Sequence, residues 1–226
     1  MSFAWYDAAV TAEVGGSDTL TFAYTVTAGA DYLVVRTASQ ADPARQVASV
    51  TFNGDALFPI VQQDDLIDIN SVAIFARRAP DIATGNVVVV WDGSVSGTAT
   101  AKSASGVKQT SDGASYRTPV SANDSGASVN ATSVAGDMVV DVIGTSSGSL
   151  VVGAGQSADA ITSPGISFRY GCSYESAVGI STTMSWTGGS VSWALAAVAL
   201  IPADAPDLSV PTLFYSRSNK RLKPPR

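Results

Sequence analysis

The sequence contains no histidine and a single cysteine, Cys172, among its 226 residues. Without histidine there is no side chain with an ordinary pKa near neutrality, no Ser-His-Asp or Cys-His constellation, and few of the usual zinc ligands. One cysteine excludes an internal disulfide, and a thiol with no histidine partner is typical of a small buried hydrophobic residue. The composition therefore predicts a protein that is not an enzyme and needs no cofactor or metal.

Charge is also scarce, because charged residues make up 14% of the chain and about 25% of an ordinary soluble domain. Small polar residues must cover much of the surface, which is typical of secreted, extracellular or virion β-proteins. The charges are unevenly placed: positions 1–216 hold eight basic and 19 acidic residues, whereas positions 217–226 hold five basic ones. We expect no nucleic acid on the acidic body, while the basic end suits an acidic partner.

Targeting and membrane-spanning segments are not recognisable in the sequence. The first ten residues have no basic region followed by a long apolar run, so no Sec signal is expected. The longest apolar run, WALAAVALI at 193–201, is far shorter than the roughly 20 residues of a membrane helix. These features predict synthesis in a cytoplasm and no membrane partner.

Two glycine-rich motifs resemble pieces of active sites. GTSSG at 144–148 matches the nucleophile-elbow pattern G-x-S-x-G, but no helix follows it and no histidine is available to take the proton. GAGQ at 153–156 lacks the rest of a dinucleotide-binding fingerprint. Both are interpreted as turns.

An acidic run, QQDDLIDIN at 62–70, offers oxygen ligands of the kind that calcium prefers. Its candidate ligands are Asp64, Asp65, Asp68 and Asn70. The spacing does not fit an EF-hand loop, and no glycine stands at the sharp turn. A solvated loop between two strands is the favoured interpretation, and calcium binding stays open.

Aromatic side chains offer a second route to ligand binding, because they stack on sugar rings. Trp186 and Trp193 fall in strands that are expected to be buried, so they are assigned to the core. Tyr32, Tyr116 and Tyr174 are the better candidates for exposed stacking positions. A hydrolase using two distant carboxylates also stays open, although 17 of the 19 acidic residues are aspartates.

Hydrophobic residues alternate with polar ones almost throughout the chain. LTFAYTV at 20–26 places Leu20, Phe22 and Tyr24 on one face, and about fourteen such runs follow one another between Gly, Asp, Asn or Pro clusters. No capped helical pattern appears. The predicted fold is all-β, a two-sheet antiparallel β-sandwich or jelly roll over residues 1–202.

Two runs, NVVVVW at 86–91 and WALAAVALI at 193–201, are apolar at consecutive positions. Each is expected to be covered on both faces, by a second sheet and by a loop or a neighbouring subunit. The Ser/Gly/Ala-rich stretch between them still alternates in places, so it is assigned to polar strands and long loops of the same domain.

SVTFNGDALFP at 49–59 contains the strongest hairpin signal in the chain. Asn53 and Gly54 are the residue types of a type I′ turn, which needs positive φ at both central positions. They are interpreted as a structural turn. A crosslink to Lys102 or Lys108 is not expected, because the sequence places no catalytic carboxylate beside either lysine.

Residues 203–226 form a Pro-rich basic segment that we expect to be an extended C-terminal arm, since proline fixes φ and removes a backbone donor. A frayed terminus is the alternative. An apolar part precedes the basic part, and both suit docking on a partner. The predicted docking residues are Leu213, Phe214, Tyr215, Arg217, Lys220, Arg221, Lys223 and Arg226.

The succession of hairpins from DYLVVRTAS through VASVTFNGDALFPIVQ, SVAIFARRAPDIATGNVVVVWDG and GDMVVDVIG to TMSWTGGSVSWALAAVALIP resembles β-sandwich proteins of tailed-phage genomes and gene-transfer-agent-like clusters. The resemblance covers about residues 20–202 and includes no catalytic residue. It implies a structural protein of a virion head or tail.

The predicted function is that of a phage virion structural protein, a capsid decoration, head-fibre or tail-associated β-sandwich held partly by its arm. The expected partners are other virion proteins and further copies of the chain in a homo-oligomer, and the expected location is the virion. The alternative is a glycan-binding adhesin that recognises a host surface glycan.

Overall fold

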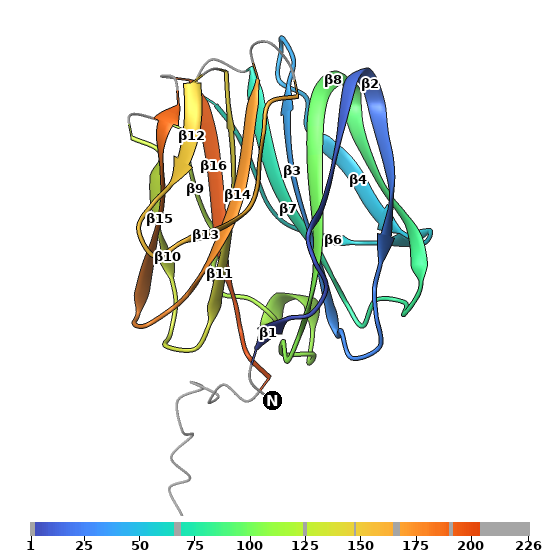
Figure 1. Ribbon diagram of the computed structural model, residues 1–226, viewed down its shortest axis with the longest axis vertical. Helices are drawn as coiled ribbons and strands as arrows, with labels where there is room; N and C mark the ends of the chain where they lie inside the picture. Colours follow the sequence, from blue (N-terminus) through green and yellow to red (C-terminus); the bar gives the residue numbers. More distant parts are fainter. Residues whose placement is uncertain are drawn as a thin grey trace, which may run out of the picture.

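The computed structural model describes residues 3–65, 69–123, 126–146, 148–164, 168–189 and 192–203, and within these ranges it contains sixteen β-strands (Figure 1). All strand pairs are antiparallel, and a single 3₁₀ turn, η1 (Asp112–Ala114), is the one helical element of the described part. The all-β sandwich predicted from the alternating sequence is confirmed.

The first lobe comprises strands β1 to β8, which hydrogen-bond into one continuous sheet in the order β5-β4-β8-β3-β7-β6, with β1 and β2 also on β8. The sheet folds over itself into an inner and an outer layer. Its strands are β1 (Ala4–Trp5), β2 (Val10–Thr25), β3 (Tyr32–Gln40), β4 (Val47–Phe52), β5 (Asp55–Ala56), β6 (Phe58–Asp64), β7 (Asn70–Arg78) and β8 (Thr84–Ser105).

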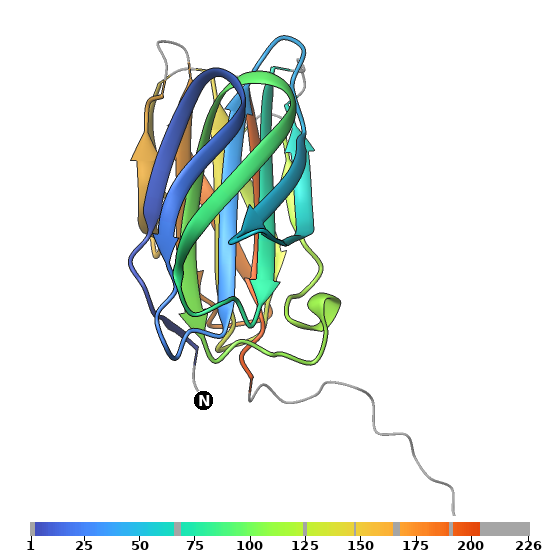
Figure 2. The same ribbon diagram turned by 90° about the vertical axis from the view of Figure 1, so that its right-hand side faces the viewer.

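Two long strands, β2 and β8, run through both layers, and Figure 2 shows them curving over at one end of the lobe. Their mutual register shifts near Gly15 and Ser17, where Gly16 takes a φ of 70°. Bulges and glycines let a strand change direction without losing its pairing on either side. The first half of β8 therefore pairs with β4, and its second half pairs with β3.

The second lobe holds a five-stranded sheet in the order β13-β14-β11-β16-β9 and a three-stranded sheet in the order β10-β15-β12. Its strands are β9 (Val120–Ala122), β10 (Ser128–Thr132), β11 (Met138–Thr145), β12 (Gly148–Val152), β13 (Ser157–Thr162), β14 (Arg169–Ser176), β15 (Ser181–Gly189) and β16 (Trp193–Leu200).

The two lobes repeat one strand arrangement. The inner-layer order β6-β7-β3-β8-β2 of the first lobe corresponds to β13-β14-β11-β16-β9 of the second. Matching hydrogen bonds fix the correspondence, since Ala79 N donates to Asp31 O (2.8 Å) and Ala177 N donates to Asp137 O (2.9 Å). The bulge between Pro59 and Val61 also recurs, between Ala158 and Ala160.

Three buried clusters lie between four successive layers of strands. The first, which includes Leu33 and Phe52, fills the interior of the first lobe. The second, which includes Val34 and Val198, lies between the inner layers of the two lobes, and the third, which includes Trp186, fills the second lobe. The inner layers are therefore buried on both faces, while each outer layer faces solvent.

This layering differs from the two-sheet arrangement and the roughly fourteen strands expected from sequence. The strands form three hydrogen-bonded sheets, because each lobe is a sandwich and the two sandwiches pack together. Strand β16 is buried at every position, as predicted, but its cover comes from strands of the same chain.

The NVVVVW run was wrongly expected to be covered on both faces. Val87, Val89 and Trp91 are buried, whereas Val88 and Val90 are partly exposed, because this half of β8 belongs to an outer layer. The Ser/Gly/Ala-rich middle forms the rest of β8, η1, β9 and β10, as strands and loops of the same fold.

The Asn53-Gly54 dipeptide joins β4 to β5. Asn53 has a φ of 52° and Gly54 a φ of 88°, the two positive values of a type I′ turn, and Phe52 pairs with Asp55 across it. Asn53 Nδ2 also donates to Asp81 Oδ2 (3.2 Å), so this side chain serves the turn and its neighbour.

Candidate functional site

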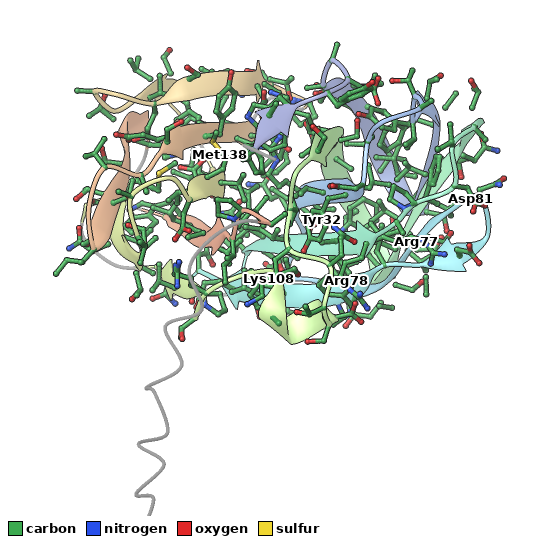
Figure 3. The ribbon with its side chains drawn as sticks, turned by 90° about the horizontal axis from the view of Figure 1, so that it is seen from below. Tyr32, Arg77, Arg78, Asp81, Lys108 and Met138 are labelled. Carbon is green, nitrogen blue, oxygen red and sulfur yellow. The ribbon has the colours of Figure 1, made fainter. Side chains whose placement is uncertain are left out.

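One end of the sandwich gathers the turns of both lobes and both ends of the described chain. Figure 3 looks onto this end, with Tyr32 and Met138, the first residues of the corresponding strands β3 and β11, on either side of the junction. The connection between the lobes crosses here, where Lys108 N donates to Ile201 O (2.8 Å). We call this face the arm end, because the chain continues into residues 204–226 from Ala203.

Large aliphatic side chains are exposed on corresponding turns of the arm end. Val178 and Ile180 of the β14–β15 turn are 90% and 85% exposed, and Ile82 of the β7–β8 turn is 61% exposed. Ile180 lies near the chain exit, because its carbonyl accepts from Ser133 N, next to a pocket that Thr132 and Ile201 line. These side chains add exposed apolar surface to turns of both lobes at this end.

Described residues at this end line three shallow pockets, which we name by their residues. The Phe58 pocket (about 410 Å³) is walled by Arg77, Arg78 and Asp112. The Lys108 pocket (about 480 Å³) reaches Asp31 and Ala203. The Tyr116 pocket (about 520 Å³) includes Arg117 and Ile201.

Both arginines of the Phe58 pocket form ion pairs. Arg77 Nη2 donates to Asp55 Oδ2 and Arg78 Nε donates to Asp112 Oδ1, both at 2.6 Å. Arg77 Nε is buried and has no hydrogen-bond partner. The pocket is therefore lined by the Phe58 ring, by two ion-paired guanidinium groups and by the Asp112 carboxylate.

The described residues of the acidic run, 62–65 and 69–70, belong to a hydrogen-bonded group of polar side chains at the end of the sandwich opposite the arm end. Asp65 is 5% exposed and accepts from Ile69 N (2.8 Å) and Asn70 Nδ2 (2.6 Å), and Ser192 of the second lobe also donates to it. Asp64 instead accepts from Gln46 Nε2 (2.9 Å). The Asp65 carboxylate thus accepts hydrogen bonds from groups of the protein itself. Asp68 lies outside the described residues.

The predicted stacking tyrosines lie at the junction of the lobes. Tyr32 was wrongly expected to be exposed: it is fully buried, because β3 faces the second lobe, and its hydroxyl contacts Ser115 Oγ (2.9 Å). Tyr116 is half-buried and stacks on Phe58 with centroids 6.1 Å apart. Tyr174 is half-buried against Trp5, with centroids 5.2 Å apart.

The remaining residues and motifs singled out from the sequence lie in the core or at turns and strand ends. Cys172 is fully buried between the lobes, as predicted, and burial raises the pKa of its thiol. Trp186 and Trp193 are core residues, 4% and 3% exposed. GAGQ forms the turn between β12 and β13, while GTSSG spans the end of β11 and the start of β12, with Ser147 outside the described residues.

A charged cluster that sequence reasoning missed lies between the lobes. Asp159 of β13 forms ion pairs with two side chains of the first lobe. Arg36 Nη2 from β3 donates to Oδ2 (2.6 Å), and Lys102 Nζ from β8 donates to Oδ1. The three side chains are 0% to 8% exposed, and Arg36 Nη1 also donates to Ser173 O (3.1 Å). These residues come from distant parts of the sequence, so no local pattern signals their meeting.

A second buried carboxylate, Asp141, lies on the other face of the second inner layer. It accepts from Trp186 Nε1 (2.7 Å) and from Ser173 N and Oγ (2.8 and 2.7 Å). Burial raises its pKa to about 6, and the hydrogen bonds from Ser173 and Trp186 oppose that rise. Asp141 is fully buried and lines none of the three pockets at the arm end, so it is a core group.

The predicted docking residues of the arm, Leu213 to Arg226, lie outside the described residues. Among the described ranges, no three His, Cys, Asp or Glu side chains are grouped to hold a metal ion. The same ranges hold no helix long and apolar enough to cross a membrane.

Comparison of the chain with protein-family models, with curated proteins and with solved structures finds no match.

Proposed function

We propose that this protein is a structural component of a bacteriophage virion, a capsid decoration, head-fibre or tail-associated sandwich attached partly through its C-terminal arm. The observation that carries the proposal is the arm end. The chain passes from Ala203 into the arm on the face where Ile82, Val178 and Ile180 are exposed. Exposed apolar turns and a basic segment later in the same chain together suit attachment to a larger, acidic surface.

The composition supports the same role. A body with few charges and a surface of small polar residues suits a chain that works among packed neighbours. The basic residues of the arm, at 217–226, contrast with the acidic body, so the arm is better suited to another protein's acidic surface than to solvent.

Truncation tests the proposal directly. A chain ending at Ala203 keeps every described strand, so it is expected to fold but to be lost from purified particles when it replaces the full-length chain. Protein mass spectrometry of the particles measures incorporation, and thermal unfolding of the isolated truncated chain checks the fold. Normal incorporation of the truncated chain would refute attachment through the arm.

Two matched variants separate the parts of the arm end. Val178→Ser with Ile180→Ser removes the exposed apolar side chains, while Thr183→Ala changes an exposed position on β15. We expect reduced incorporation for the first variant and unchanged incorporation for the second. Equal incorporation of the two would exclude the apolar turns from the contact.

A glycan-binding adhesin is the second candidate, and the Phe58 pocket is the observation that favours it. Its lining residues Phe58, Arg77, Arg78 and Asp112 offer an aromatic ring and charged hydrogen-bond partners. A glycan array is expected to give binding that Arg78→Ala removes if the chain is an adhesin. A silent array supports the purely structural role.

A further inference from the structure

The contact between Lys102 and Asp159 brings together the two groups of an amide bond. Lys102 belongs to β8 of the first lobe and Asp159 to β13 of the second, and their side chains are 8% and 4% exposed. The ammonium is ion-paired with Asp159 Oδ1. An amine and a carboxyl group are thus held against each other, nearly out of contact with water.

The corresponding positions of the opposite lobes show that the fold does not require charges there. Strand register matches Lys102 to Val198, because they pair with Val34 and Val140 at equivalent places. The recurring bulge matches Asp159 to Ile60. Both apolar residues belong to or pack against the cluster between the lobes.

Buried ion pairs give little net stability, since desolvation offsets the attraction and apolar replacements are often equally stable. The same molecule has apolar residues, Val198 and Ile60, at the positions equivalent to Lys102 and Asp159. The charges on the other side therefore call for a reason other than packing.

The surroundings of Lys102 favour an amine that reacts. Its Nζ lies 4.3 Å from the centroid of the Trp5 ring and 4.1 Å from that of Tyr174, so two aromatic rings shield it from water. Burial lowers the pKa of Lys102, and the ion pair with Asp159 opposes this change. A lysine with a lowered pKa has more of the neutral, nucleophilic form at neutral pH.

Arg36 is placed to activate the carboxyl group. Its Nη2 donates to Oδ2 of Asp159 at 2.6 Å, the oxygen that Lys102 does not contact. Attack at Cγ places negative charge on that oxygen, and a preorganised guanidinium in a dry site stabilises such charge.

We propose that Lys102 and Asp159 are joined by an isopeptide bond that ties the two lobes together. A proton passes from Nζ to Oδ1, and the neutral amine then attacks Cγ of Asp159. The bond from Cγ to Oδ1 breaks as Nζ gives up a second proton to that oxygen, so one water molecule leaves. The product is a neutral amide whose carbonyl oxygen, Oδ2, accepts from Arg36. The inference does not depend on the virion role.

Intact mass spectrometry of the purified full-length chain tests the bond. The wild-type mass is expected to be lower than the sequence mass by one water molecule, and tryptic digestion is expected to give a branched peptide joining Lys102 to Asp159. Lys102→Met and Asp159→Ala should each restore the full sequence mass. Lys108→Met, the matched control lysine, should remain one water molecule light.

A wild-type chain with its full sequence mass would overturn the proposal, whether or not the variants fold. Loss of water that persists in Lys102→Met would also overturn it, because the loss would then come from another position. Electrophoresis under denaturing conditions gives a second readout: the wild type should migrate faster than Lys102→Met, since an internal bond keeps the unfolded chain more compact.

Discussion

The two lobes use one strand arrangement but differ in how their layers connect and in what they bury. In the first lobe, β2 and β8 run unbroken through both layers, whereas β15 and β16 belong to separate sheets in the second. The positions of Ile60 and Val35 are apolar in the first lobe, while their equivalents in the second, Asp159 and Asp141, are buried carboxylates. The shared arrangement therefore depends on the apolar pattern of the strands and tolerates either chemistry at these sites.

The comparison extends to one tryptophan in each lobe, because the second lobe provides its tryptophan with a hydrogen-bond acceptor and the first lobe does not. Trp91 and Trp186 each precede a Ser-Val-Ser sequence. Trp186 Nε1 donates to Asp141, whereas Trp91 Nε1 is buried without a partner. A buried donor without a partner costs free energy that a paired one does not. The two tryptophans offer an internal control for that cost.

The largest expected effect comes from removing the Asp159 side chain between the lobes. Asp159→Ala leaves the buried charges of Arg36 and Lys102 without the group that both contact, so we expect the free energy of unfolding to fall by about 3–5 kcal/mol. Ile60→Ala, at the equivalent bulge, should cost less because Ile60 is only half-buried. Urea unfolding of both variants measures the difference.

An apolar triple variant sharpens this result. Arg36→Met, Lys102→Met and Asp159→Leu together leave no unpaired charge, so the triple variant should be more stable than Asp159→Ala. If it is equally unstable, the cost lies in packing, and the comparison with the apolar counterparts Ile60 and Val198 fails.

The next effect is a dependence of stability on pH that comes from Asp141, whose equivalent in the first lobe, Val35, cannot titrate. Folded Asp141 keeps its proton up to about pH 6, whereas the unfolded chain loses it near 3.8. The folded state therefore binds more protons between these values, and its stability falls as pH rises through this window, by at most about 3 kcal/mol. Melting temperatures of Asp141→Asn and wild type at several pH values should diverge in this range. Parallel curves would refute the assignment.

The tryptophans should respond unequally to the same substitution. Trp186→Phe removes a hydrogen bond to a buried carboxylate, whereas Trp91→Phe removes a donor that has no partner. We expect the first to cost about 1.5–3 kcal/mol more than the second, as measured by urea unfolding. Equal costs would mean that the bond to Asp141 contributes nothing net.

The smallest effect concerns the corresponding turns after β4 and β12. A Cβ at Gly54 would meet no atom within 4 Å, so Gly54→Ala should cost only the strain of its φ of 88°, about 1–2 kcal/mol. Gly155 has the same φ, but its Cβ would lie 2.6 Å from Glu175 Oε1. Gly155→Ala should therefore be the more destabilising, and thermal unfolding of the pair ranks them.

Much of the fold was accessible from the sequence because it depends on local chemistry. Alternation from Leu20 onward predicted the strands, and the residue types of Asn53 and Gly54 predicted a turn that the structure places between β4 and β5. The repeat of the two lobes was missed, although WDGSVS at 91–96 and WTGGSVS at 186–192 are a visible signal of it. The exposure of Tyr32 was predicted wrongly, because a strand's alternation does not show whether its second face meets solvent or another layer.

The sequence by itself determined the class of the protein: an all-β chain without histidine, with a buried cysteine and an acidic body followed by a basic segment. Those properties follow from composition and from neighbours along the chain. Only the tertiary structure decided that two sandwiches pack through their inner layers and that Arg36, Lys102 and Asp159 meet there. Their meeting depends on strand register and on a bulge in β13, which set contacts between residues far apart in sequence.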